Sequence, residues 1–422
     1  MAKKNSIISN IFSLGALQGL NYLLPLIILP YLVRVLGVEK FGEIAFAQSF
    51  IQYFITLTNY GFQVTASRDI STVRDSPEDV SCVFWSVILV KVALLAISVM
   101  IIISLVELLP LFMGKETVIF ASALAVVGHV MMPTWFYQGL ERMKYILIVN
   151  VVARGAMVPL IFLFVVNEND YVLAAALIAF GFTLAGAIGF FVAFRIYPLK
   201  VVFPPFDMLI RRVLSGRHVF VASIGHVLYS STSVAFLLGM LTTSTVVGYF
   251  SAAERLVRAV QGMVLPVSQS LYPHIVSLAK NNRVEALRFI SISLRWSTLV
   301  FFILSLLLYF SAELLVEIVL GAEFKKSVSV VQWMAFIPFV TALGNVLGVQ
   351  TMLVFGLDKY FSRAYVAAAA INLGALFFLV ESFQQNGAAI TVFITETFLT
   401  FLFIILLKNK GFHFQLFPPS IR

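Results

Sequence analysis

The chain has 422 residues, of which 60% are hydrophobic and 12% are charged, and its mean hydropathy is +0.99. This composition excludes a soluble globular protein, because it describes a chain whose main solvent is lipid. The formal net charge of +9 does not favour a nucleic-acid-binding protein, since no basic stripe falls on a soluble segment. The single cysteine, Cys82, excludes an intrachain disulfide and a multi-cysteine metal site.

Apolar segments of roughly 20 residues recur along the chain, the length that a helix needs to cross about 30 Å of hydrocarbon. They predict an all-α, polytopic membrane protein with about twelve transmembrane helices. In chain order, the expected spans are 11–33, 44–64, 83–106, 118–137, 145–166, 172–194, 219–241, 247–271, 286–308, 328–354, 364–380 and 388–407.

The first expected span carries polar residues and two prolines. Gln18 and Asn21 share one helix face, and Pro25 and Pro30 follow. The prolines predict that the outer half of this helix is bent or locally unwound. One interpretation is a gating helix, and the alternative is an ordinary membrane helix, in which prolines are common.

Lysine and arginine are distributed unequally between alternate loops. Nineteen fall in one set of connecting segments and termini, and five fall in the opposite set. The positive-inside rule therefore predicts that both termini are cytoplasmic. An error of one helix would scramble this alternation, so the asymmetry also supports the count of twelve.

A proline-containing, basic segment divides the chain in two. We expect an N-terminal six-helix lobe at 1–197, a cytoplasmic linker at 198–216, a C-terminal six-helix lobe at 217–407 and a cytoplasmic tail at 408–422.

An internal comparison supports the division into two lobes. Residues 41–47 resemble residues 247–253, and residues 139–141 resemble residues 356–358. Matches in order at offsets of a little over two hundred residues are typical of a duplicated six-helix unit. Parallel repeats of this kind predict an alternating-access transporter with its substrate in a central cavity between the lobes.

Five cations lie inside the expected spans, where an ionised side chain costs several kcal/mol and normally faces protein or a water-filled cavity. They are Lys91, Arg154, Arg255, Arg258 and Arg295. Guanidinium groups match phosphate geometry bidentately, so these residues predict a binding pocket for an anion such as a diphosphate. The alternative is that they pair with acids or extend to the membrane interface.

Two carboxylates, Glu254 and Glu396, also lie well inside expected spans. Either could carry a proton or help to bind a cation during coupled transport. The alternative is a salt bridge, and Glu254 is spaced to pair with Arg258 at i, i+4. The three histidines in or near spans, His129, His218 and His226, are interpreted as ordinary helix residues.

Several sequence blocks carry a family resemblance. The most specific is QGLNYLLPL at 18–26, followed by PYLVRVLG at 30–37. Further blocks are YGF at 60–62, WFYQGLE at 135–141, GAAI at 387–390 and Thr395-Glu396. Over essentially the whole chain these residues resemble the Wzx-type O-antigen flippases, which move lipid-linked oligosaccharides.

That family belongs to a superfamily that includes multidrug and toxin extruders and the lipid II flippases. Residues 250–256, FSAAERL, resemble the eighth helix of lipid II flippases, where an acidic residue followed by arginine lies in the central cavity. By this resemblance Glu254 and Arg255 take cavity positions. The chain departs from the lipid II flippases because residues 46–50 lack their cavity carboxylate and because two additional helices are missing.

The resemblance implies a flippase of the bacterial inner membrane that moves an undecaprenyl-diphosphate-linked oligosaccharide, the O-antigen repeat unit, from the cytoplasmic to the periplasmic leaflet. It also implies contact with membrane lipid and with a polysaccharide polymerase and a chain-length regulator as partner proteins. No Walker A pattern occurs in the sequence, so we expect a proton or sodium gradient as the energy source and no cofactor.

Three alternatives stay open. A multidrug extruder of the same superfamily would favour acids and aromatics in its cavity, whereas cations dominate here. A lipid II flippase is disfavoured by the departures above. A membrane enzyme such as a polymerase or ligase would need catalytic residues on a large outer loop, and the longest one, near 313–326, has no histidine and no nucleophile constellation.

Overall fold

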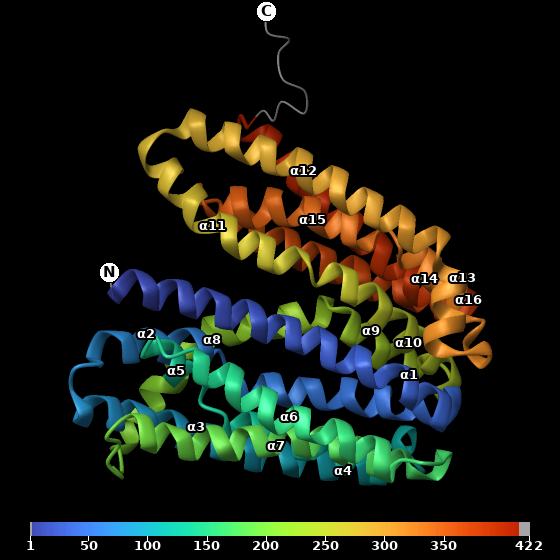
Figure 1. Ribbon diagram of the computed structural model, residues 1–422, viewed down its shortest axis with the longest axis horizontal. Coiled ribbons are helices and arrows are strands. Elements are labelled where there is room, and N and C mark those ends of the chain that lie inside the picture. The colour runs from blue at the N-terminus through green and yellow to red at the C-terminus, as the bar shows by residue number, and fades with distance from the viewer. Residues whose placement is uncertain (1, 413–422) are drawn as a thin grey trace, which may run out of the picture. The chain divides into compact units, whose positions relative to one another are not determined.

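The computed structural model describes residues 2–412, and in this part of the chain it contains helices and turns but no strand (Figure 1). The expected all-α class is therefore confirmed. Side chains are described for these residues except at positions 2–18, 20–23, 222, 226, 229, 231 and 273.

The chain divides into two compact units. Unit 1 comprises Met1–Leu24 and Arg34–Leu228, and unit 2 comprises Pro25–Val33 and Tyr229–Arg422. The predicted lobes, 1–197 and 217–407, stay a prediction, since these units are defined by packing and not by the internal repeat. Most of the predicted tail, at 413–422, lies outside the described residues.

Unit 1 contains the first eight α-helices, apart from the nine residues of α1 that pack with unit 2. Its elements are α1 (Ala2–Asn59), α2 (Phe62–Val73), α3 (Pro77–Leu108), η1 (Pro110–Phe112), α4 (Glu116–Met131), α5 (Thr134–Gly139), α6 (Lys144–Phe164), η2 (Glu168–Asp170), α7 (Tyr171–Ile196) and α8 (Phe206–Tyr229).

Unit 2 contains the remaining helices. They are α9 (Ser231–Leu241), α10 (Ser244–Gln261), α11 (Val264–Asn281), α12 (Arg283–Phe310), α13 (Ala312–Leu315), η3 (Val316–Leu320), η4 (Ala322–Phe324), α14 (Ser327–Met334), α15 (Ile337–Leu347), η5 (Gly348–Leu353) and α16 (Asp358–Asn409).

Every expected span overlaps helical segments, but five of them cross a boundary between two helices. These are 44–64, 118–137, 219–241, 247–271 and 328–354. Two long helices each hold two spans, because α1 is interrupted at Gly37 (φ 69°) and α16 at Gln384 (φ 48°). The seventh span is divided between α8 and α9, and residues 206–216 of the predicted linker form the first turns of α8. Within the described residues, seven segments are long and apolar enough to cross a membrane by the criteria of length and hydropathy alone.

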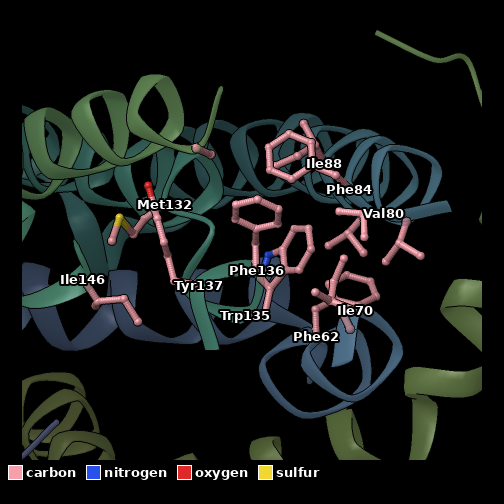
Figure 2. Packing of buried hydrophobic residues seen from close by; sticks show 14 of the residues in the cluster. Phe62, Ile70, Val80, Phe84, Ile88, Met132, Trp135, Phe136, Tyr137 and Ile146 are labelled. Atoms are coloured by element: carbon pink, nitrogen blue, oxygen red, sulfur yellow. The ribbon is translucent and has the colours of Figure 1, made fainter. Parts of the chain in front are cut away.

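The core of unit 1 is rich in aromatic side chains, and Figure 2 shows part of it. Trp135, Phe136 and Tyr137 are at most 1% exposed. The rings of Trp135 and Phe136 pack with Phe84 of α3, and the ring of Tyr137 packs with that of Phe136. Burying one such ring removes roughly 150–250 Å² from solvent. The WFYQGLE block is therefore part of the hydrophobic core of unit 1.

Helix α7 packs along α4 and α6 through a row of small residues. Gly181, Ala185, Gly189 and Ala193 recur every fourth position and are all buried. Gly186 lies beside this row, and a Cβ atom added there would lie 2.3 Å from the carbonyl oxygen of Gly128 on α4. Small residues at such spacing allow membrane helices to approach closely, so the sequence of α7 specifies where α4 lies.

Candidate functional site

Two of the predicted binding cations, Lys91 and Arg154, belong to one cluster in unit 1. Lys91 of α3 is 2% exposed, and its Nζ donates a hydrogen bond of 2.6 Å to the carbonyl oxygen of His129 on α4. The guanidinium carbon of Arg154 on α6 lies 4.4 Å from the ring centroid of Phe182 on α7. The imidazole ring of His129 stacks on the same phenyl ring at 5.0 Å.

The charge in this cluster is positive. Among the ion pairs of residues 2–412, none involves Lys91. A buried ammonium normally has a carboxylate partner, because removing a charge from water is costly. Its only hydrogen-bond acceptor in the described part of the chain is a backbone carbonyl, so the charge of Lys91 is not neutralised by an acid there.

Helix α10 positions the acid–base pair that was expected from its i, i+4 spacing. Glu254, whose side chain is 9% exposed, lies with one carboxylate oxygen 2.6 Å from Nη2 of Arg258. The same Nη2 donates a hydrogen bond of 3.0 Å to Oγ1 of Thr232 on α9. Arg258 therefore links two helices of unit 2 while 36% of its side chain stays exposed.

This pair lines a small polar pocket inside unit 2. The pocket has a volume of about 20 Å³, which is space for about one water-sized occupant. Its polar lining is Glu254, Arg258, Gln261, Asn372, Thr395 and Glu396. The structure thus brings together the two intramembrane carboxylates that the sequence singled out.

The remaining two predicted cations also lie in unit 2. Arg255, adjacent to Glu254 on α10, and Arg295 of α12 are both half-buried. The five cations are therefore divided, with Lys91 and Arg154 in unit 1 and the other three in unit 2.

The predicted gating helix corresponds to the first half of α1. Helical dihedrals continue through Pro25 and Pro30, and the interruption lies further on, at Gly37. Pro25 and Pro30 belong to the segment of α1 that packs with unit 2. The side chain of Asn21, the third residue of this prediction, lies outside the described residues.

Several polar residues of the small pocket were not predicted from the sequence. Asn372 is 1% exposed, and its Nδ2 donates a hydrogen bond of 3.2 Å to Oγ1 of Thr395. Its own Oδ1 is buried and has no hydrogen-bond partner among the residues that the structure describes. Gln261 donates to Oγ1 of Thr341 at 3.1 Å. An amide inside an apolar span was a usable signal, since intramembrane polar residues normally face the protein interior.

A further cluster of charged residues, Lys40, Glu43 and Lys115, lies between the expected spans of unit 1. The Nζ of Lys40 lies 3.0 Å from the Glu43 carboxylate, and this hydrogen bond raises the pKa of Lys40. Burial lowers the pKa of Lys115, and the charge of Glu43 opposes that shift. Glu43 is 6% exposed. The Glu43 carboxylate thus interacts with two lysines, Lys40 by a hydrogen bond and Lys115 through its charge.

Comparison with known proteins gives a consistent family. The model of a family described as "Polysaccharide biosynthesis protein" matches residues 7–279. Two curated relatives are both named "Putative O-antigen transporter". The one from Escherichia coli (strain K12) is 34% identical over 96% of this chain and 98% of its own length. The one from Shigella dysenteriae is 26% identical over 94% of this chain and 99% of its own length.

Solved structures show the same fold at low sequence identity. The lipid II flippase MurJ in an inward closed conformation has a TM-score of 0.69 and 14% identity, covering 96% of this chain and 89% of that chain. An inward-facing MATE family transporter of the MOP superfamily has a TM-score of 0.67 and 14% identity, covering 94% of this chain and 98% of that chain. These matches confirm the fold of a multi-pass membrane transporter with about twelve helices.

Proposed function

Because this chain belongs to the polysaccharide biosynthesis protein family, in which its curated relatives are named for O-antigen transport, we propose that it is a flippase for a lipid-linked oligosaccharide. The cargo is an undecaprenyl-diphosphate-linked O-antigen repeat unit, moved from the cytoplasmic to the periplasmic leaflet by alternating access. No covalent step is involved, so the protein acts as a transporter and not as an enzyme. The family match over most of the chain carries this proposal.

The diphosphate of the cargo binds to cations of the spans, with Arg255 as the principal ligand. Arg255 is half-buried and its neighbour Arg258 is partly exposed, so a ligand outside the packed helices can reach both side chains. Arginine presents two parallel N–H donors to a phosphate, which offsets part of its desolvation. Arg295 adds a third guanidinium in the same unit, and Lys91 with Arg154 supplies positive charge in the other.

Coupling to an ion gradient takes place in the small pocket of unit 2. A volume of about 20 Å³ accommodates a water-sized occupant but not a diphosphate. Carboxylate, hydroxyl and amide oxygens are suitable ligands for a hard cation, and a carboxylate can alternatively carry a proton. Glu254 and Glu396 supply the charge, and protonation or cation binding there competes with the Arg258 ion pair.

The protein resides in the bacterial inner membrane with both termini in the cytoplasm, as the distribution of lysine and arginine favours. In this location it receives its cargo from the cytoplasmic leaflet and delivers it to a polysaccharide polymerase and a chain-length regulator.

The first test is flipping of a fluorescent undecaprenyl-diphosphate oligosaccharide in proteoliposomes that contain the purified protein. Arg255→Ala should slow flipping about 10-fold to 100-fold, the effect of losing charge-assisted hydrogen bonds. Arg255→Lys should restore part of the rate, because it restores the charge without the bidentate geometry.

The control is Arg211→Ala, since Arg211 of α8 is exposed and outside the predicted site. Unchanged flipping by Arg255→Ala would show that this arginine is structural. If the native chain moves organic cations but none of several lipid-linked oligosaccharides, a multidrug extruder is the better description.

A further inference from the structure

A second, larger pocket lies in unit 2, away from the intramembrane carboxylates. Its volume is about 430 Å³, within the range of roughly 300–1,000 Å³ that is typical of ligand pockets. The end of α9, the start of α10, the residue before α14 and the break in α16 surround it. Its polar and aromatic lining is Thr242, Thr243, Thr245, Tyr249, Lys326, Glu381, Gln384 and Gln385.

The backbone at this pocket is fixed in an unusual conformation. Gln384 has φ 48° and ψ −123°, dihedrals that a residue other than glycine rarely adopts. Nearby, a Cβ atom added to Gly387 would lie 2.1 Å from the carbonyl oxygen of Leu379, so this turn is closely packed. Strain of this kind persists where the surroundings hold it, and it concentrates at ligand sites.

One buried polar group in the pocket has no partner. Gln385 is 9% exposed, and within the described residues its Oε1 is buried and makes no hydrogen bond. An orphaned amide oxygen inside a protein is unfavourable, because it has lost its hydrogen bonds to water without gaining others. The side chain of Gln385 lines the pocket while Oε1 itself is turned away from solvent, so rotation of the amide toward an occupant would give this oxygen a donor.

Hydrogen bonds to backbone and side-chain groups hold the walls of the pocket together. Ser327 of α14 donates to the carbonyl oxygen of Tyr249 at 2.9 Å, and Ser329 donates to Oδ1 of Asn386 at 2.8 Å. Buried Phe324 packs edge-on against the Tyr249 ring at 6.1 Å. The walls from α10, α14 and α16 are therefore connected without using the pocket's own amides and threonine hydroxyls.

The charge balance indicates what kind of molecule fits. Lys326 and Glu381 contribute one charge of each sign, and the other polar groups are hydroxyls and amides. A diphosphate would need an excess of cations, which this lining lacks. The Nζ of Lys326 lies 5.7 Å from the centroid of the Tyr249 ring, so both side chains belong to one wall of the pocket. Paired donors and acceptors beside an aromatic side chain suit a neutral ligand that is rich in hydroxyl and acetamido groups.

We infer that this pocket binds the glycan part of the cargo, as a site separate from the cations that bind its diphosphate. The inference rests on the proposed function. Tyr249 and Arg255 belong to the same helix, and six residues separate them by about 9 Å along its axis. By the predicted topology, the pocket lies at the periplasmic end of unit 2, where the glycan must emerge.

The test compares two ligands in equilibrium binding to the full-length protein in detergent. One is labelled undecaprenyl diphosphate with a single sugar, and the other carries a neutral, N-acetylated oligosaccharide. Native protein should bind the oligosaccharide lipid more tightly. Gln385→Leu should raise the Kd for that lipid about tenfold and leave the Kd for the single-sugar lipid unchanged, because it removes hydrogen bonds to the glycan alone.

Thr245→Val is the second variant, since it removes a pocket hydroxyl at nearly constant shape and keeps the test valid if Gln385→Leu fails to fold. Gln350→Leu is the matched control, because Gln350 is also buried, its Oε1 has no hydrogen-bond partner in the described part of the chain, and it does not line this pocket. Equal Kd changes for both lipids, or no change for either, would overturn the glycan site alone. Native protein that binds neither lipid would instead overturn the proposed function.

Discussion

The buried ammonium of Lys91 makes a prediction for the stability of the protein. Its ammonium is held by the carbonyl oxygen of His129 and no carboxylate neutralises it within the described residues. Replacing a buried ion pair by apolar side chains of similar volume is often neutral or stabilising, and a buried charge without an acid lacks even the attraction of a pair. Lys91→Met should therefore leave the free energy of unfolding unchanged or raise it by about 1–2 kcal/mol, measured by thermal unfolding in detergent.

The matched control for this prediction is Lys359→Met, because Lys359 is exposed and its charge is already solvated. A clear drop in the Tm of Lys91→Met alone would mean that the ammonium stabilises the fold, through its hydrogen bond or a bound anion. Flipping measured on the same variant separates stability from transport, since the proposed anion site loses one cation.

At the same scale, the sequence predicted some contacts and not others. The Glu254–Arg258 pair was predictable because both residues lie one turn apart on one helix. The contact of Lys91 with His129 spans 38 positions and depends on how α3 packs against α4. The contact of Asn372 with Thr395 depends in the same way on the turn between the two halves of α16. Composition and spacing cannot give such pairings.

At the scale of elements, the close approach of α4 and α7 depends on two glycines. The carbonyl oxygen of Gly128 lies where a Cβ of residue 186 would be, at 2.3 Å. Gly186→Ala should therefore force the helices apart and destabilise the protein by about 1–3 kcal/mol, the usual cost of overpacking.

Gly155→Ala on α6 is the control for this prediction. An added Cβ at Gly155 meets nothing within 4 Å, and alanine favours a helix by up to about 1 kcal/mol. Both substitutions add one methyl group to a helix, so a difference between their Tm values reports the surroundings of that methyl group. We expect Gly186→Ala to lower the Tm and Gly155→Ala to raise it. A similar Tm for both variants would mean that α4 and α7 can separate without cost.

Element boundaries show where the sequence pattern was sufficient. Hydrophobic length placed every expected span on helical segments, because the extent of an apolar segment is read directly from the sequence. It did not predict the helix ends that fall inside five of these spans. The break at Gln384 was not predicted at its residue, since glutamine has no intrinsic preference for positive φ and the tight packing of Gly387 enforces it. The prolines predicted that the outer half of the first helix is bent or locally unwound, whereas helical dihedrals continue through Pro25 and Pro30 and the interruption occurs at Gly37.

At the scale of the whole molecule, the orientation in the membrane can be measured directly. In a Cys82→Ser background, Met113→Cys should react with an impermeant maleimide in intact cells, because Met113 is 77% exposed on a predicted outer loop. Phe203→Cys should react only after permeabilisation, since Phe203 is 86% exposed in the predicted cytoplasmic linker. The reverse pattern would invert the topology and the proposed direction of transport.

The assignment of Pro25–Val33 to unit 2 has a consequence for biosynthesis. The chain passes between the units at three points, near residues 24, 33 and 228, so a single cut cannot separate them. These nine residues are synthesised long before the helices with which they pack, because domains form N-terminal first during translation. Unit 2 is therefore incomplete until Pro25–Val33 packs with its other helices, and a C-terminal half expressed alone lacks these nine residues.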